Sequence, residues 1–199
     1  MRKVQKPELL IGGIGQLQTA YSLQKKLGGW KPDLVIQAGI GGAPSPEDIG
    51  KVYAIRSESL ADLGALDNTG FRSLFEMGLQ EPDQFPFLQG KLPNPYNSML
   101  EWTNLPLLDG VTVNEIRETG QSAFQRNLLP FVESMEGAAL HYVCLMEKIP
   151  FLQIRSISNI IGDRDKSRWK IEEAIENLHR SLVILIQKLE NADKTLFRI

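Results

Sequence analysis

The most restrictive feature of this sequence is an alternation of short apolar runs, typical of strands, with longer stretches of helical periodicity. The strand-like runs cover residues 9–11, 33–38, 51–55, 110–114, 131–135 and 150–157. The helical stretches cover residues 16–27, about 136–148, and 171–189. Strands that alternate with helices predict an α/β fold, with glycines where strands pass into loops. Ligands of such folds usually bind beyond the carboxyl ends of the strands, so residues at those ends are the candidates for a binding site.

One stretch, from about Glu76 to Leu108, breaks this alternation. It contains the prolines Pro82, Pro86, Pro93, Pro95 and Pro106. Prolines at this density prevent a continuous helix or a central strand, so we expect an irregular excursion. Several aromatic residues also lie there, and two interpretations stay open: a packed surface loop, or a lid or subunit contact.

Composition and charge limit the partners of the protein. Lys and Arg total 22 against 24 for Asp and Glu, which gives no basic excess for binding nucleic acid. No apolar run approaches the roughly 20 residues of a membrane-spanning helix. Cys144 is the single cysteine, and with only His141 and His179 beside it there are too few ligands for a Cys/His metal cage. We therefore expect one cytoplasmic domain over residues 1–199, with no cofactor or metal and neither nucleic acid nor membrane as partner.

Two glycine clusters follow strand-like runs, at residues 12–15 and 39–42. Gly13 and Gly41, within them, could let backbone N–H groups approach an anion or a sugar. Neither cluster is a Walker loop, since no Lys-Ser/Thr pair follows, and neither completes the dinucleotide-binding fingerprint. Taken alone, each cluster is more typical of a tight turn than of a ligand-binding loop.

The run Ser134-Met135-Glu136-Gly137-Ala138-Ala139 puts an acidic residue at a strand-to-helix junction, followed by three small residues. Glu136 could accept hydrogen bonds from two ribose hydroxyls, with Met135 as an apolar surface under the sugar. The alternative is that Glu136 serves only as an acidic residue in the first helical turn, where the helix dipole favours it.

A second polar junction follows the strand-like run at 150–157. Ser158 and Asn159 come directly after buried residues, so Asn159 is placed to present its amide to a ligand. A turn-forming asparagine is the alternative interpretation.

Together these segments resemble the nucleoside phosphorylase/hydrolase superfamily, whose purine nucleosidase branch includes methylthioadenosine/S-adenosylhomocysteine nucleosidase. The resemblance is greater to the futalosine hydrolase family and covers nearly the whole chain. The matching segments are 12–15, Lys31-Pro32-Asp33 into 39–42, Asp62-Leu63-Gly64-Ala65, Gly110-Val111-Thr112-Val113-Asn114, 135–139, and 150–158 through the polar run 159–170 into 174–178.

The resemblance implies a three-layer α/β/α fold with a central mixed sheet, a small purine nucleoside as partner, and a homodimer or higher homo-oligomer. The implied activity is hydrolysis of the N-glycosidic bond of futalosine to release hypoxanthine, in menaquinone biosynthesis. Three alternatives stay open: a methylthioadenosine/S-adenosylhomocysteine nucleosidase, a purine nucleoside phosphorylase, and an inactive remnant that only binds nucleoside.

The resemblance also implies residue roles. Glu136 and Asn159 are the predicted catalytic residues, and the predicted substrate-binding residues are Gly13, Gly41, Asn114, Met135, Glu136, Ser158 and Asn159. Adenosine-type nucleosidases carry an aspartic acid that protonates N7 of adenine where this chain has Asn159. An amide cannot supply a proton, but its NH₂ can donate to N7 or O6 of a 6-oxopurine. The substitution therefore favours an inosine-like base. Arg164 and Lys166 either meet the carboxylate of the non-purine end of futalosine or form a solvated charge cluster.

One departure from the family pattern concerns the N-terminus. In the family a first strand and a hairpin precede the turn at 12–15, and the loop after that strand supplies the acidic residue that activates water. Here the fold is expected to be N-terminally shortened, and Glu8 lies in the wrong context to replace that residue. We expect either that the sequence is incomplete or that the chain binds nucleoside but hydrolyses it poorly.

Overall fold

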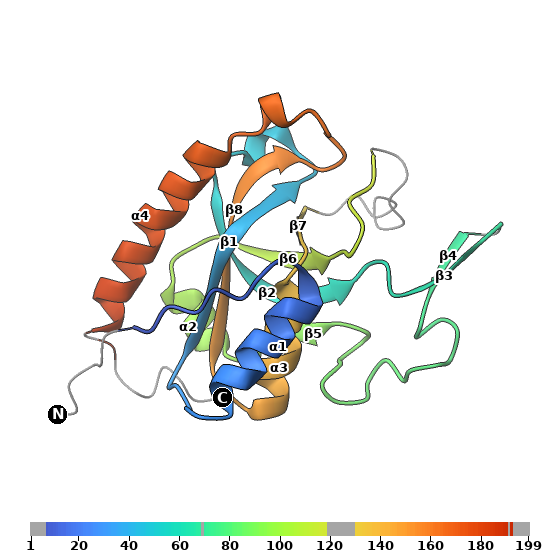
Figure 1. Ribbon diagram of the computed structural model, residues 1–199, viewed down its shortest axis with the longest axis horizontal. Helices are drawn as coiled ribbons and strands as arrows, with labels where there is room; N and C mark the ends of the chain where they lie inside the picture. The colour runs from blue at the N-terminus through green and yellow to red at the C-terminus, as the bar shows by residue number, and fades with distance from the viewer. Residues whose placement is uncertain (1–6, 69, 119–129, 191, 193–199) are drawn as a thin grey trace.

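A computed structural model describes residues 7–68, 70–118, 130–190 and 192 (Figure 1). The helices are α1 Gly15–Leu27, α2 Asn97–Trp102, α3 Gly137–Glu147 and α4 Ile171–Leu189, with short 3₁₀ turns at Pro46–Asp48 and Lys166–Arg168. The strands are β1 Val35–Ala43, β2 Val52–Leu60, β3 Gly64–Asp67, β4 Gly70–Ser73, β5 Leu92–Pro93, β6 Leu107–Thr112, β7 Phe131–Ser134 and β8 Phe151–Ile160.

Six strands form a mixed sheet in the order β5-β2-β6-β7-β1-β8, and a further pairing of β2 with β8 closes five of them into a ring. Neighbours β1/β8, β2/β6 and β6/β7 are parallel, whereas β1/β7, β2/β8 and β2/β5 are antiparallel. Strand β8 is buried over most of its length because it has neighbours on both sides. The remaining two strands, β3 and β4, form a hairpin that projects from the side of the molecule (Figure 1).

Helices cover the sheet in two layers. Helix α4 packs on β1 and β8 through Ala174, Leu178 and Leu185, which recur at helical spacing and are buried. Helices α1 and α3 pack against each other on the other side of the sheet (Figure 1). The predicted α/β fold with helices around a central mixed sheet is confirmed. Within the described residues no helix combines the length and apolar character needed to cross a membrane.

Two sequence-based predictions of local structure are wrong, and a third, that of an irregular excursion without a continuous helix or central strand, needs only a qualification. Residues 9–11 form no strand, because no described strand lies beside them to form hydrogen bonds with their backbone. Leu9 is accordingly 89% exposed. The glycines at 39–42 form no strand-to-loop turn but lie inside β1. The excursion between Glu76 and Leu108 holds short regular elements, β5 and α2, since a proline is tolerated in a two-residue edge strand.

Candidate functional site

Glu136 lies where β7 ends and α3 begins, and its carboxylate binds donors from two distant segments. Its Oε1 atom accepts a hydrogen bond of 3.0 Å from the backbone N–H of Gly15. Its Oε2 atom lies 3.5 Å from Nη1 of Arg155. Glu136 is the N-cap residue of α3, but its side chain makes no capping hydrogen bond. The carboxylate is thus held by tertiary contacts, and 21% of the side chain remains exposed to a ligand.

Arg155, on β8, is a site residue that the sequence interpretation missed. Its side chain is buried, and it donates hydrogen bonds to Oε1 of Gln37 at 2.9 Å and to the carbonyl oxygen of Ile40 at 3.4 Å. Burial lowers the pKa of Arg155, while the nearby Glu136 and Glu58 carboxylates oppose that shift. An arginine directly after the apolar Ile154 in a predicted strand was the available signal, because a buried guanidinium requires a carboxylate partner.

A second buried carboxyl group, that of Glu58, lies beneath the first turn of α3. Its Oε1 accepts a hydrogen bond of 2.7 Å from Nε2 of Gln153, and its Oε2 accepts one of 2.9 Å from the Thr112 hydroxyl. The same hydroxyl accepts a 2.8 Å hydrogen bond from the backbone N–H of Ala138. Burial raises the pKa of Glu58 to about 7, against the opposing effects of Gln153, Thr112 and Arg155. This network connects β2, β6 and β8 to the helix end that carries Glu136.

The turn at residues 12–15 is tied to the end of β6. Gly13 has a φ of 89°, a conformation in which a side chain would be strained. Next to the turn, Nε2 of Gln16 donates a 3.2 Å hydrogen bond to Oδ1 of Asn114. The amide of Asn114 donates in turn to the Asp62 carboxylate at 3.0 Å. Two predicted substrate-binding residues, Gly13 and Asn114, are thereby brought to the Glu136 end of the site.

Asn159 lies near the end of β8 and is half-buried. Its Oδ1 accepts a 2.7 Å hydrogen bond from the Ser158 hydroxyl, which also lies 3.2 Å from the carbonyl oxygen of Gly41. Its Nδ2 donates a 3.1 Å hydrogen bond to the carbonyl oxygen of Ile160. Among the described residues this is the one hydrogen bond that the amide donates, which leaves its second hydrogen for a ligand.

The glycines of β1 make room for neighbouring groups. A side chain at Gly39 would overlap the guanidinium of Arg155, and one at Gly42 would lie 3.2 Å from Nδ2 of Asn159. A Cβ atom at Gly41 would lie 2.8 Å from the carbonyl oxygen of Glu133 on β7. The sequence interpretation gave these glycines a role in backbone approach to a ligand. The structure gives them one in packing, and the contact of Gly41 with substrate stays a prediction.

Glu133, on β7, is another residue that the sequence interpretation missed. It is half-buried and pairs in register with Gly42. Burial, with a smaller contribution from the negative charge of Asp62, raises the pKa of Glu133 to about 7. Met135, two residues along, packs against an apolar cluster of Ala61, Val111, Val113, Phe131 and Ile161. Within the sequence alone nothing separated Glu133 from an ordinary surface glutamate.

The predicted residues therefore form two groups, joined by β7. One contains Gly13, Asn114 and Glu136, and the other contains Gly41, Ser158 and Asn159. Glu136 follows Glu133 by three positions, so their Cα atoms lie within roughly 11 Å of each other. The two groups are therefore candidates for the two ends of a single site, one near Glu136 and the other near Asn159.

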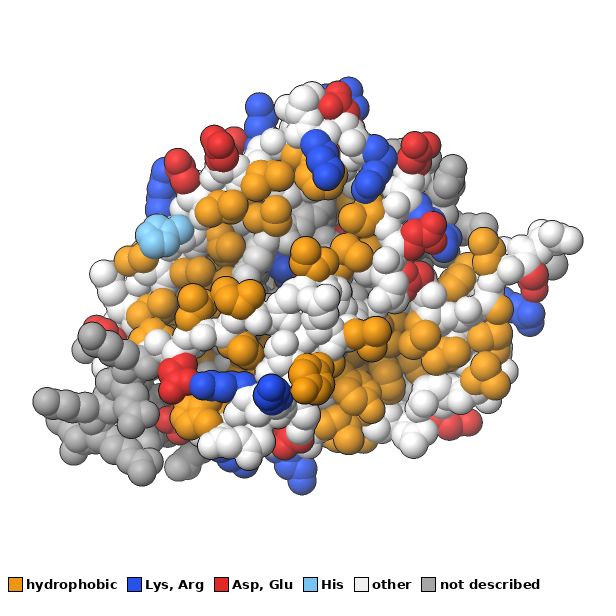
Figure 2. All heavy atoms as spheres, in the orientation of Figure 1, with side chains coloured by type: hydrophobic (Ala, Val, Ile, Leu, Met, Phe, Trp, Pro, Cys, Tyr) orange, Lys and Arg blue, Asp and Glu red, His pale blue; other side chains and the backbone are white. Residues whose placement is uncertain are grey.

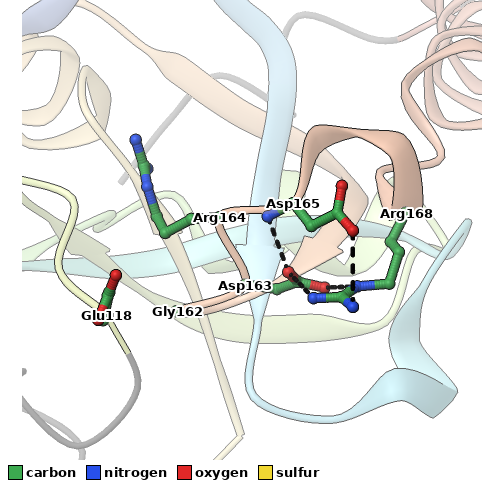
Figure 3. Close-up of a pocket in the computed structure, with 6 residues that line it drawn as sticks. All are labelled: Glu118, Gly162, Asp163, Arg164, Asp165 and Arg168. Carbon is green, nitrogen blue, oxygen red and sulfur yellow. Dashed lines mark hydrogen bonds and ion pairs between the residues drawn. The ribbon is translucent and has the colours of Figure 1, made fainter.

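The loop after β8 forms a pocket lined by Glu118, Gly162, Asp163, Arg164, Asp165 and Arg168 (Figure 3). Arg168 is paired with Asp163 and lies 3.6 Å from Asp165. Arg164 turns away from this cluster (Figure 3). Asp163, Asp165 and Arg168 thus neutralise one another within the loop. Arg164 also lines the pocket, and among the described residues it has no ion-pair partner.

No protein-family model matches the chain. The chain is 29% identical over 194 residues to futalosine hydrolase from Streptomyces coelicolor, covering 92% of this chain and 80% of that protein. It is 25% identical over 189 residues to 5'-methylthioadenosine/S-adenosylhomocysteine nucleosidase from Psychromonas ingrahamii, covering 92% of this chain and 80% of that protein.

Solved structures share the fold. Native futalosine hydrolase from Helicobacter pylori superposes with a TM-score of 0.68 at 13% identity, covering 89% of this chain and 77% of that one. S-adenosylhomocysteine nucleosidase from Streptococcus pyogenes, in complex with 5-methylthiotubericidin, gives a TM-score of 0.69 at 19% identity, covering 92% of this chain and 78% of that one. The fold is therefore that of the nucleoside phosphorylases and nucleosidases. In sequence the chain is similar to futalosine hydrolases and to 5'-methylthioadenosine/S-adenosylhomocysteine nucleosidases.

Proposed function

We propose that this protein is a purine nucleosidase that hydrolyses the N-glycosidic bond of futalosine and releases hypoxanthine, in menaquinone biosynthesis. The futalosine hydrolases among its relatives support this substrate. The observation that carries the proposal is the pairing of a ligand-accessible carboxylate, Glu136, with an amide, Asn159, at the two ends of the site. We further propose that residues 1–199 act as one cytoplasmic domain without a cofactor.

The chemistry assigns a task to each end of the site. Breaking the bond between C1' and N9 builds positive charge on the ribose and negative charge on the departing base. Glu136 accepts hydrogen bonds from the ribose hydroxyls, while the fixed contacts with Gly15 and Arg155 keep its carboxylate in place. Asn159 donates its free amide hydrogen to N7 or O6 of the base. An adenine base presents a 6-amino donor where hypoxanthine presents an acceptor, so Asn159 disfavours the methylthioadenosine alternative.

Release of hypoxanthine from futalosine, measured by chromatography, tests this function. The wild-type chain should release hypoxanthine without added phosphate, and Glu136→Ala should lose at least about 100-fold in nucleoside affinity, because charge-assisted hydrogen bonds contribute roughly 1.5–3 kcal/mol each. Glu47→Ala, an exposed change in the 3₁₀ turn after β1, is the matched control.

Different outcomes separate the alternatives. Release that requires phosphate would support a phosphorylase, and release of adenine from methylthioadenosine in preference would support that nucleosidase. Tight binding of inosine without any release would support a nucleoside-binding role. Unchanged nucleoside affinity in Glu136→Ala would contradict the role given to Glu136.

We also propose that the protein forms a homodimer through the outer face of α1 and α3. Exposed apolar residues Ile14, Leu17 and Tyr21 follow one another at helical spacing at the start of α1 and along it. Tyr142 and Met146 continue this surface on α3. Hydrophobic side chains gather over this side of the molecule (Figure 2). Contiguous apolar surface of this kind is typical of an interface.

Analytical ultracentrifugation tests this assembly. Leu17→Glu should convert a dimer into a monomer, whereas Ile184→Glu, an exposed apolar position on α4, should not. A wild-type chain that sediments as a monomer at micromolar concentration would contradict the proposal.

A further inference from the structure

Glu133, Gly42 and Asn159 form one row across three neighbouring strands. Gly42 of β1 pairs with Glu133 of β7 on one side and with Asn159 of β8 on the other. Residues directly opposite each other on neighbouring strands carry their side chains on the same face. A Cβ atom at Gly42 would lie 3.2 Å from Nδ2 of Asn159, so this is the face that the amide occupies. Gly42 therefore lies between a residue with a carboxyl group and one with an amide. A Cβ atom there would also lie 3.1 Å from Cγ1 of Ile161, so only a glycine lets Asn159 and Ile161 pack this closely in the row.

This row carries the two kinds of group that hydrolysis of a nucleoside needs near its base. The departing purine must receive a proton, because its anion is a poor leaving group. Asn159 can donate a hydrogen bond but cannot give up a proton at any ordinary pH. A carboxyl group that keeps its proton near neutral pH can do so.

The surroundings of Glu133 keep that proton in place. Its register partners on the two flanking strands, Gly42 on β1 and Val111 on β6, carry no charge. The charged group that acts on it is Asp62, in the loop after β2, and both this negative charge and burial favour the protonated form. Within the described part of the chain no hydrogen-bond donor contacts the Glu133 carboxyl group, so nothing there stabilises its anion.

We propose that Glu133 is the catalytic acid that delivers a proton to the departing purine, while Asn159 holds the same base by a hydrogen bond. This inference rests on the proposed nucleosidase function. As the bond between C1' and N9 breaks, its electron pair goes to the purine, and the Glu133 carboxyl proton goes to a purine nitrogen. A water oxygen then bonds to C1', and the proton that water loses passes to solvent. The Glu133 carboxylate takes up a proton from solvent before the next turnover.

The pH dependence of hypoxanthine release tests this assignment. In the wild type, kcat/KM should fall above about pH 7 with the loss of one proton. Glu133→Gln should reduce kcat at pH 6 by about 100-fold or more, the usual range for a missing general acid, and should remove the fall above pH 7. Glu133→Asp should keep the fall with a smaller loss of rate. Glu47→Gln, an exposed change, is the control.

Calorimetric binding of hypoxanthine gives a readout that does not need turnover. The wild type should bind hypoxanthine more tightly below pH 7 than above it, and Glu133→Gln should show no such dependence. If Glu133→Gln fails to fold, Asp62→Asn serves as the second variant. Removal of the Asp62 charge should lower the pKa of Glu133, so the weakening of hypoxanthine binding should begin at a lower pH than in the wild type.

The outcomes separate this inference from the proposed function. A wild type that releases no hypoxanthine from futalosine overturns the function, while the binding profile still tests Glu133. A fall above pH 7 that persists in Glu133→Gln overturns the assignment of the acid. Hypoxanthine that binds equally at all pH values, or not at all, overturns it as well.

Discussion

The two ends of the candidate site are held in different ways. At the Glu136 end, the carboxylate contacts Gly15 and Arg155, which lie far from it in the sequence, and the buried Glu58 supports the helix turn beneath. At the Asn159 end, the amide bonds to Ser158 and Ile160, its immediate neighbours in the chain.

This difference indicates that the two ends respond differently to substitution. The Glu136 end depends on contacts with several strands and with helix α1, so changes there should affect folding and the proposed ribose binding together. The Asn159 end depends on local hydrogen bonds, so the base preference can be altered without disturbing the fold. Four substitutions separate these effects.

Gly137→Ala should have the largest effect on stability. A Cβ atom at Gly137 would overlap the Glu58 carboxyl group and the Gln153 amide. We expect a loss of about 2–3 kcal/mol in the free energy of unfolding, the usual range for overpacking a buried site, measured by urea denaturation. Gly28→Ala is the control, since its nearest neighbours would lie 3.6 Å away and its φ is −62°. Equal stability of the two variants would contradict tight packing of Glu58 and Gln153 around Gly137.

Glu58→Gln should alter the pH dependence of stability. The pKa of Glu58 is about 7 in the folded protein, above the ordinary 4.5, so its contribution is complete below pH 4.5 and is lost as the pH rises through 7. We expect the wild type to lose on the order of 1–3 kcal/mol between pH 5 and pH 8, and Glu58→Gln to lose less. Part of the pH dependence of stability should remain in Glu58→Gln, because the pKa of Glu133 is also raised in the folded protein. Denaturation at the two pH values measures both slopes, and identical slopes would argue against a neutral buried carboxyl at Glu58.

Asn159→Asp should change the base preference and leave the fold intact. A carboxyl group can donate a proton where the amide cannot, which favours a 6-amino purine over a 6-oxopurine. We expect a shift of about tenfold, or 1.4 kcal/mol, in the ratio of affinities for adenosine-like and inosine-like ligands. Calorimetry with both ligands measures the ratio. A ratio that does not move would remove Asn159 from base recognition.

Arg164→Ala should have the smallest effect, confined to the non-purine end of the substrate. The described residues give Arg164 no ion pair, and it lines the pocket after β8 (Figure 3). If it meets the carboxylate of futalosine, its loss should raise KM for futalosine about threefold to tenfold, the usual range for an exposed charge contact, with no change in affinity for inosine. An equal change for both nucleosides would show that Arg164 does not contact that carboxylate.

The sequence predicted the α/β fold and the main helices because apolar periodicity reports burial directly. Helix α4 begins and ends where the pattern of Ile171 to Leu189 does. The sequence also predicted Glu136 and Asn159 as candidate site residues, since polar residues that follow apolar runs at strand ends can be recognised without a structure.

Residues whose roles depend on pairing across the sheet were not predictable in this way. Arg155 and Glu58 lie in runs that otherwise read as strand interior, and only the closed sheet places them beneath Glu136. Glu133 gains its surroundings from the register of β7 with β1, which no local pattern specifies. The glycines of β1 were misinterpreted for the same reason, because the groups that they accommodate come from the neighbouring strands β7 and β8.

A crystal structure of the protein with a non-hydrolysable inosine analogue is the decisive measurement. Ribose hydroxyls should lie within hydrogen-bond distance of the Glu136 carboxylate, and the purine ring should contact both Glu133 and Asn159. A nucleoside bound with its base away from Glu133 and Asn159, or with its ribose away from Glu136, would show that these residues do not form the site.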